Sequence, residues 1–184
     1  MQSALLISSA LLLGGCGILS SEPYRETAIY DISGGKAKQL PAFAVRIDGF
    51  NNLTPANRKM IFRQTDGRLL EAPYTAWAQA PEQMLRRYLS EYFARDYMTS
   101  TRAGCDISGS IFQFDFDYQR KKMLLGVNYE INYRTGNNTP QVYTGTFVAE
   151  AAAESADGPG AAAALSACAA EFAAEIEAKL LTIK

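Results

Sequence analysis

The stretch Met60–Tyr97, MIFRQTDGRLLEAPYTAWAQAPEQMLRRYLSEYFARDY, decides the fold because it predicts a hairpin, a corner and a helix in direct succession. Asp66 and Gly67 are a residue pair typical of a primed two-residue turn, in which both central residues adopt positive φ. We therefore expect two antiparallel strands, over about Lys59–Thr65 and Arg68–Ala72.

A corner and an amphipathic helix follow this hairpin. Pro73 is expected to end the second strand, and Trp77 lies at the corner, where we expect it to pack with Arg63 as structure rather than as a ligand site. Pro81 suits the first turn of a helix, where its missing N–H costs no hydrogen bond. Apolar residues then recur with helical spacing and must lie on an apolar surface. They are Met84, Leu85, Tyr88, Leu89, Tyr92 and Phe93.

The order of residues in this stretch resembles that of the ABC-type transport auxiliary lipoproteins, the PqiC-like family. The matching residues are Met60 to Arg63, Leu69, Tyr74, Trp77, Ala78, Leu85 and Leu89. The resemblance implies an α+β fold and a non-enzymatic accessory role in an MCE-type ABC lipid-transport system of the bacterial cell envelope. It also implies contacts with an MCE-type periplasmic protein or with ABC transporter subunits.

Length and composition narrow the functional classes. The chain has 184 residues, enough for one domain with a sizeable core. Its formal net charge is −1 and its basic residues are dispersed, which argues against a nucleic-acid partner. The sequence contains no histidine, so the commonest general base and the usual zinc ligand sets are missing. We therefore expect no enzymatic activity, no metal and no cofactor.

Residues 1–15 have the features of a secretion signal: they are uncharged and apolar, and the apolar run is too short to span a bilayer. Their end, Leu13, Gly14 and Gly15 followed by Cys16, resembles the bacterial lipobox, in which the cysteine receives a lipid before cleavage. A simple apolar helix is the alternative, but the two glycines would break it. No Lys or Arg precedes the apolar run, which departs from the usual signal.

A lipidated cysteine would hold the protein on a membrane, because two or more fatty-acyl chains such as palmitate anchor a protein stably. Gly17 follows it, and by resemblance to sorted lipoproteins this implies the outer membrane, with the domain facing the periplasm. We expect residues 16–39 to form a lipidated tether and 40–184 a single domain. A short edge strand is expected in the tether at Ala28, Tyr30 and Ile32.

The rest of the chain predicts further strands and a terminal helix. Alternating apolar residues predict strands at Ala42–Phe50, Cys105–Tyr118, Lys122–Arg134 and Gln141–Glu150. After a Gly-Pro-Gly break, Ala161–Leu181 predicts an Ala-rich amphipathic helix. The expected fold is α+β: a mainly antiparallel sheet of about six strands with both helices on one face.

Within Cys105–Tyr118 the apolar residues occupy odd positions up to Ile111. After Ile111 they are aromatic and occupy even positions. Since strand side chains alternate with a period of two, the change has two possible explanations. One is a bulge inside a single core. The other is an aromatic strip on the uncovered sheet face, which would bind another protein or another copy of this chain. The residues of this candidate partner-binding strip are Phe112, Phe114, Phe116 and Tyr118.

Two pairs of acids are candidates for catalysis. Asp115 and Asp117 share one strand face, whereas Glu175 and Glu177 do not face each other on a helix. Neither pair has a histidine, a metal-ligand cluster or a Gly-rich phosphate loop beside it. We therefore expect all four to be solvated surface acids.

Two cysteines remain beside the lipobox cysteine. Export would place the domain in an oxidising compartment, where Cys105 and Cys168 are expected to form a disulfide if the last helix crosses the sheet face above the Cys105 strand. The alternative is two buried free thiols on different layers, because free cysteine packs as a small apolar group.

A second function stays open beside transport. An envelope scaffold that regulates a cell-wall or secretion machine would share the lipid anchor and the α+β domain. Neighbouring permease, ATPase and MCE genes would favour transport. A homo-oligomer is compatible with either function.

Overall fold

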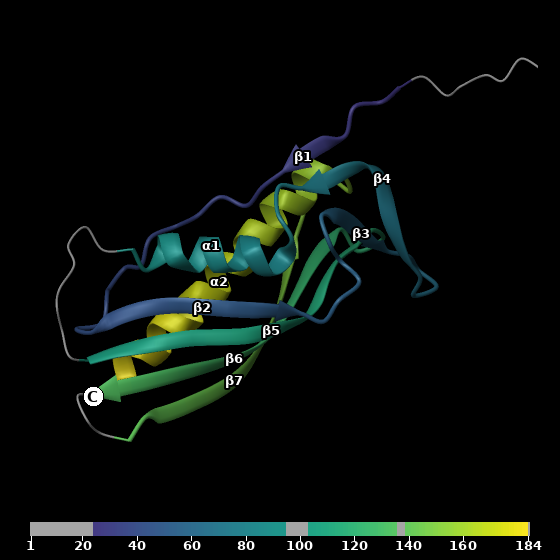
Figure 1. The fold of residues 1–184 in the computed structure, drawn as a ribbon. Helices are drawn as coiled ribbons and strands as arrows, with labels where there is room; N and C mark the ends of the chain where they lie inside the picture. Colours follow the sequence, from purple (N-terminus) through teal and green to yellow (C-terminus); the bar gives the residue numbers. More distant parts are fainter. Residues whose placement is uncertain (1–23, 95–102, 136–138, 184) are drawn as a thin grey trace, which may run out of the picture.

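The computed structural model describes residues 24–94, 103–135 and 139–183. Within these residues the chain forms a seven-stranded sheet and two helices (Figure 1). The elements, in chain order, are β1 (Ala28–Tyr30), β2 (Ala44–Asn52), β3 (Lys59–Arg63), β4 (Leu69–Trp77), α1 (Pro81–Tyr92), β5 (Ala103–Asp117), β6 (Lys122–Thr135), β7 (Gln141–Ala152) and α2 (Gly158–Thr182).

The sheet is mixed rather than mainly antiparallel, and it has seven strands rather than about six. Its order is β1-β4-β3-β5-β6-β7, with β2 also paired to β5. The pairs β1–β4, β2–β5 and β3–β5 are parallel, and the other three are antiparallel. The direction of pairing was not predictable, because alternation of side chains is the same in parallel and antiparallel strands.

The β3–β4 hairpin was predicted correctly, but its turn was not. Of the two central residues, Gly67 has a positive φ of 83° and Asp66 does not. Gly67 N–H donates to Gln64 O at 2.9 Å, and Gln64 N–H donates to Arg68 O at 2.8 Å. This is a three-residue loop, a type I turn followed by a left-handed glycine. It replaces the predicted primed two-residue turn.

Pro73 does not end its strand, because β4 continues to Trp77. The pairing of β3 with β4 is irregular between Lys59 and Ile61, and Pro73 lies opposite this irregularity. A proline is tolerated in a strand where no ladder hydrogen bond is required of it. The bulge therefore accounts for the extension of β4.

The terminal helix begins earlier than predicted. The Gly-Pro-Gly sequence that was expected to break the chain forms the first turn of α2. Asp157 is the N-cap residue, and its Oδ1 accepts a hydrogen bond from Gly160 N–H at 2.9 Å. The cap lowers the pKa of Asp157, chiefly through a hydrogen bond from Ser155 and then through that of Gly160. The start of α1 at Pro81 is confirmed.

Both helices pack on one face of the sheet, as predicted, and leave the other face uncovered (Figure 1). Phe172 of α2 lies at the centre of this core and is fully buried. Its ring centroid is 6.2 Å from that of Phe50, 5.8 Å from that of Tyr129 and 5.1 Å from that of Phe147. These rings belong to β2, β6 and β7, so α2 joins three strands.

The segment after β1 crosses both helices and is held by a buried carboxylate. Glu177 on α2 is 7 % exposed, so the prediction of a solvated acid was wrong for this residue. Its carboxylate accepts hydrogen bonds from Tyr92 Oη at 2.6 Å, from Gln39 N at 2.8 Å and from Lys38 N at 3.2 Å. Burial alone would raise the pKa of Glu177, but these hydrogen bonds outweigh burial and lower it.

Replacing Glu177 with glutamine is expected to destabilise the domain by about 1–2 kcal/mol at pH 7, because charged hydrogen bonds are lost. The pKa of Glu177 lies below its ordinary value of 4.5 in the folded state. The charged form therefore stabilises the fold above that value, and this stabilisation is lost as the pH falls through the lowered pKa. Denaturant titrations should show the difference between the two proteins shrinking below about pH 4.5. A difference that stays constant down to pH 3 would contradict the proposed contacts.

The predicted disulfide between Cys105 and Cys168 is wrong, because both are free and buried. Cys168 Sγ donates to Met123 O at 3.7 Å, whereas Cys105 pairs with Tyr133 in the ladder. Met123 and Tyr133 lie at opposite ends of β6, so the two thiols are separated by about 30 Å of strand. A disulfide requires Cα atoms within about 7 Å. Burial raises the pKa of each thiol to about 12.

The predicted signal, with Cys16 and Gly17, lies outside the described residues. Of the helices in the described part of the chain, neither is long and apolar enough to cross a membrane.

Candidate functional site

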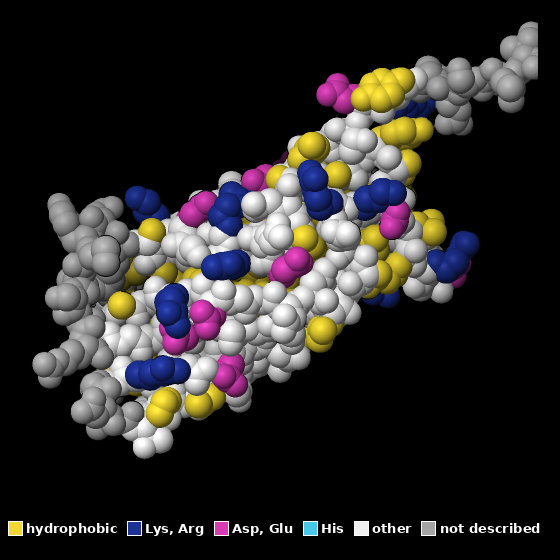
Figure 2. Space-filling view, in the orientation of Figure 1, with side chains coloured by type: hydrophobic (Ala, Val, Ile, Leu, Met, Phe, Trp, Pro, Cys, Tyr) yellow, Lys and Arg dark blue, Asp and Glu magenta, His cyan; other side chains and the backbone are white. Residues whose placement is uncertain are grey.

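The uncovered sheet face carries two depressions. The first, which we call the polar hollow, has a volume of about 580 Å³ and lies over the middle of β2, β5, β6 and β7. Its lining consists of Gly49, Asn51, Ser108, Gly109, Ser110, Asn128, Tyr129, Glu130, Thr144, Gly145 and Thr146. Few charged side chains lie in this area in Figure 2.

Three polar side chains of the hollow, those of Asn128, Glu130 and Thr146, make side-chain hydrogen bonds. Thr146 Oγ1 donates to Asn128 Oδ1 at 2.8 Å. Glu130, the one acid of the lining, accepts a hydrogen bond from Asn132 Nδ2 at 2.6 Å. The hollow is therefore uncharged apart from Glu130, and its side chains are those of an ordinary wet sheet face.

A bulge in β5 explains why the apolar residues change from odd to even positions along this strand. The β5–β6 register shifts between Ile111 and Gln113. After the shift, Phe114 and Phe116 are 4 % and 1 % exposed. Phe114 packs against Trp77 with ring centroids 5.7 Å apart, and Phe116 against Phe62 of β3 at 5.6 Å. The bulge interpretation is confirmed, and the predicted partner-binding strip is wrong for these two residues.

The other two aromatic residues of the predicted strip are exposed but do not lie together. Phe112, 39 % exposed, is the bulged residue, and its ring covers Gly126 on the uncovered face. A Cβ at Gly126 would lie 2.6 Å from this ring, so the glycine is required by the close approach. Tyr118, 51 % exposed, follows the end of β5 and contacts Phe62. Of the predicted strip, Phe112 is therefore exposed on the uncovered face and Tyr118 is exposed beyond the end of β5.

The second depression, which we call the wedge pocket, exists because two strands share one edge of β5. β2 lies along this edge up to the hydrogen bond from Leu53 N to Ile111 O, which is 2.9 Å long. β3 pairs with the same edge from Phe116 onwards. Between them lies a pocket of about 210 Å³. Its lining consists of Leu53, Thr54, Pro55, Arg63, Leu69, Phe112, Gln113, Phe114 and Asp115.

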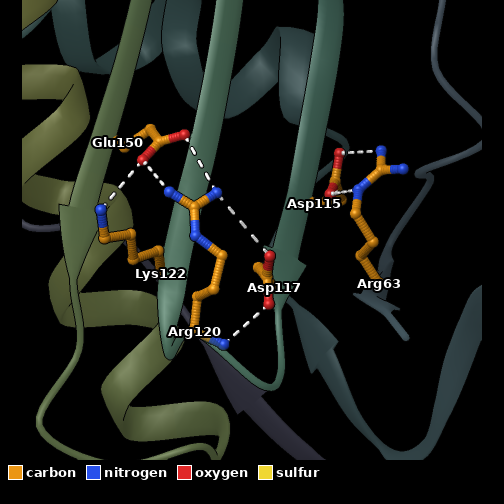
Figure 3. Close-up of polar contacts among 6 residues, drawn as sticks. All are labelled: Arg63, Asp115, Asp117, Arg120, Lys122 and Glu150. Carbon is orange, nitrogen blue, oxygen red and sulfur yellow. Dashed lines mark hydrogen bonds and ion pairs between the residues drawn. The ribbon is translucent and has the colours of Figure 1, made fainter. Parts of the chain in front are cut away.

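The lining of the wedge pocket includes an ion pair between Arg63 and Asp115, which Figure 3 shows. Arg63 donates from Nε to Asp115 Oδ2 at 2.7 Å and from Nη2 to Asp115 Oδ1 at 3.0 Å, a bidentate arrangement. The hydrogen bond to Asp115 raises the pKa of Arg63 above its already high value, against the opposing effect of burial. Asp115 is 4 % exposed, so the prediction of a solvated acid was also wrong here.

Beside the ion pair, charges of alternating sign continue along the sheet end (Figure 3). Arg120 lies 2.7 Å from Glu150 and 3.9 Å from Asp117, and Lys122 lies 3.0 Å from the same glutamate. The hydrogen bonds from Lys122 and then from Arg120 lower the pKa of Glu150. Two bases and two acids balance each other, so this array does not single out an ion of one sign.

The wedge pocket combines an ion pair with exposed apolar side chains. Both carboxylate oxygens of Asp115 accept a hydrogen bond from Arg63. In the described residues no three His, Cys, Asp or Glu side chains come together as metal ligands. Apolar side chains are instead exposed around the wedge pocket at Leu53, Leu69 and Phe112. The arrangement can accept an apolar side chain of a partner.

Comparison with known proteins gives one family and several solved structures. The sequence model of one family, described as ABC-type transport auxiliary lipoprotein component, matches residues 36–177. No curated protein matches the chain. A crystal structure of an uncharacterized protein has a TM-score of 0.64 at 14 % identity and covers 85 % of this chain and 99 % of its own. The crystal structure of a Xanthomonas campestris protein has a TM-score of 0.62 at 15 % identity, with coverages of 85 % and 95 %. At these identities the likeness shows the fold alone.

Proposed function

This chain belongs to the family of ABC-type transport auxiliary lipoprotein components, and we propose that it is a lipid-anchored accessory protein of an MCE-type ABC lipid-transport system. It has no enzymatic role in this proposal. It acts through protein–protein contacts made in the periplasm.

The anchor of the proposed protein is a lipid on Cys16, and Gly17 directs it to the outer membrane. The proposal joins an outer-membrane anchor to a folded domain that reaches an MCE-type protein or ABC transporter subunits. Family membership supports the lipoprotein and auxiliary parts of this proposal. The choice of membrane and of the MCE system rests on the residues at the N-terminus and on the family resemblance.

The observation that carries the binding role is the wedge pocket. Leu53, Leu69 and Phe112 are 66 %, 38 % and 39 % exposed around it. Apolar side chains grouped around a pocket on a face that no helix covers are a feature of protein-binding surfaces. Arg63 uses two of its five N–H donors for Asp115, and its side chain is 35 % exposed. A remaining donor can therefore bond to a backbone carbonyl of the partner.

Adjacent leucines supply the test. Leu69→Ser should weaken binding to the MCE-type protein at least tenfold, because it removes one wall of the wedge pocket. Leu70→Ser is the matched control, since Leu70 is 45 % exposed but does not line the pocket. Both variants are made in the full-length lipoprotein, and co-purification with the tagged MCE-type protein and the ABC subunits is measured from membranes.

Three results would count against the proposal. Equal binding by the Leu69 and Leu70 variants would remove the wedge pocket from the interface. Absence of the MCE-type protein and of the ABC subunits from the wild-type complex would remove the transport role. Capture of a cell-wall or secretion component in their place, lost in Leu69→Ser, would favour the envelope scaffold.

A further inference from the structure

The sheet ends in a long edge strand. β7 pairs with β6 from Gln141 to Ala152 and is the last strand in the sheet order. The other end of the sheet is β1, which has three residues. β2 pairs only with β5, but its edge carries Arg46 and Asp48 and is irregular between Ile47 and Gly49, which are features that discourage strand pairing. β7 therefore presents the longest regular edge in the described residues for pairing with another strand.

This edge has few of the features that prevent strand pairing. Natural edge strands are protected by charged residues, proline or bulges. The segment Gln141–Ala149 has no charged residue and no proline, and its pairing with β6 has no register shift. Val142, Thr144, Thr146 and Val148 are all exposed. An edge of this length and composition fits a strand partner.

The sequence of β7 is nearly palindromic about Gly145. Residues 142–148 read V-Y-T-G-T-F-V, so valine, aromatic and threonine recur at equal distances on the two sides of the glycine. In an antiparallel pair, residues at equal distances from the centre of pairing lie opposite each other. Two copies of β7 centred on Gly145 would place Thr144 opposite Thr146 and Val142 opposite Val148.

We propose that β7 pairs antiparallel with β7 of a second copy of this chain, across a two-fold axis at Gly145, and joins the two sheets into one. A two-fold interface must be self-complementary, because each residue meets its counterpart in both directions. The palindrome meets this condition with like side chains at each pair. Thr–Thr, β-branched and aromatic cross-strand pairs are among those that stabilise sheets.

The two faces of the joined sheet agree with this register. On the helix side, Tyr143 of one copy lies opposite Phe147 of the other; Tyr143 is 39 % exposed and would gain cover from the pairing. Glu150 lies opposite Pro140, so the nearest acids of the two copies do not face each other. Either kind of antiparallel pair, with or without mutual hydrogen bonds, can have a two-fold axis at its centre.

The expected dimer is weak. A single strand pair buries less than the roughly 1,600 Å² of a standard interface. We therefore expect a dissociation constant of about micromolar or higher for the dimer. Two chains held on one membrane have a raised effective concentration, which favours the pair. This strengthening rests on the proposed anchor, but the pairing itself does not depend on a transport partner.

Disulfide trapping tests the register. Full-length copies carrying Thr144→Cys and Thr146→Cys, each with a different tag, are expressed together and oxidised in cells. Directly opposed residues lie within about 5.5 Å, inside the limit for a disulfide, whereas diagonal neighbours lie about 7–8 Å apart. We expect a mixed dimer when both variants are present and at least tenfold less when either is expressed alone. Equal trapping in all three combinations, or in none, overturns the register.

A charge exchange separates pairing from folding. Thr144→Lys/Thr146→Lys places lysines opposite lysines, and Thr144→Glu/Thr146→Glu places acids opposite acids. Each double variant alone should lose at least tenfold in co-purification of two tagged copies, and the mixture of both should restore it. Both positions are exposed, and rescue by the mixture requires folded partners. Unchanged self-association of either variant overturns the proposal, as does trapping of the cysteines to a different protein instead of a second copy.

Discussion

Replacing Phe116 with alanine is expected to lower the free energy of unfolding by about 3–5 kcal/mol, the usual loss for a buried phenylalanine. The ring is 1 % exposed and stands edge-on to Phe62 at 5.6 Å. It lies where β3 joins β5 through two ladder pairs, so its removal leaves a cavity at this short junction. Equilibrium denaturation in urea, monitored by fluorescence and by far-UV circular dichroism, measures the loss.

Tyr118 provides the control for this prediction. It is two residues further along the chain and 51 % exposed, so Tyr118→Ala should change stability by about 0.5 kcal/mol or less. A loss of about 0.5 kcal/mol or less in both variants would mean that both rings are exposed. That result would contradict the bulge and return support to the aromatic strip.

The comparison of Phe116 with Tyr118 shows what alternation along one strand can and cannot predict. The sequence pattern indicates that the apolar phase changes after Ile111, because side-chain direction is a local property. It does not indicate which face is covered after the change. That depends on β3, β4 and Trp77, which pack against the second half of β5 from distant parts of the chain.

The regular elements were predictable for the same reason. The stripe that begins at Pro81 and the alternation from Lys122 gave α1 and β6 within about one residue, because each pattern is complete within its own segment. Parallel pairing was not predictable. Two strands, β2 and β3, lie along one edge of β5, and nothing within either segment specifies its neighbour.

The buried acids were missed because their partners are remote in sequence. Glu177 bonds to backbone N–H groups 138 and 139 residues away, and Asp115 bonds to an arginine 52 residues away. A single acid in a polar segment is more often exposed than buried, so the general rule gave the wrong answer for both. No signal for the Asp115–Arg63 pair was available, because nothing within either segment places the Arg63 strand beside β5.

Replacing Arg63 with alanine is expected to destabilise the protein by about 3 kcal/mol. Breaking a buried ion pair usually costs 3–5 kcal/mol, because the remaining charge stays buried without a partner. The low end applies here, since the Arg63 side chain is 35 % exposed while that of Asp115 is 5 % exposed. Urea denaturation at pH 7 of the variant and of the wild type gives the difference directly.

A double substitution shows where this loss originates. Arg63→Leu/Asp115→Leu removes both charges and should recover most of the stability, because apolar residues often replace a buried pair with little cost. Asp115→Leu alone should be milder than Arg63→Ala, since Arg63 can turn towards solvent or towards Asp117, whereas Asp115 cannot reach solvent without moving β5. If the double variant is as unstable as Arg63→Ala, the loss comes from the packing of the arginine stem against the wedge pocket instead. In that case the pocket would depend on the side-chain volume of Arg63 and not on its charge.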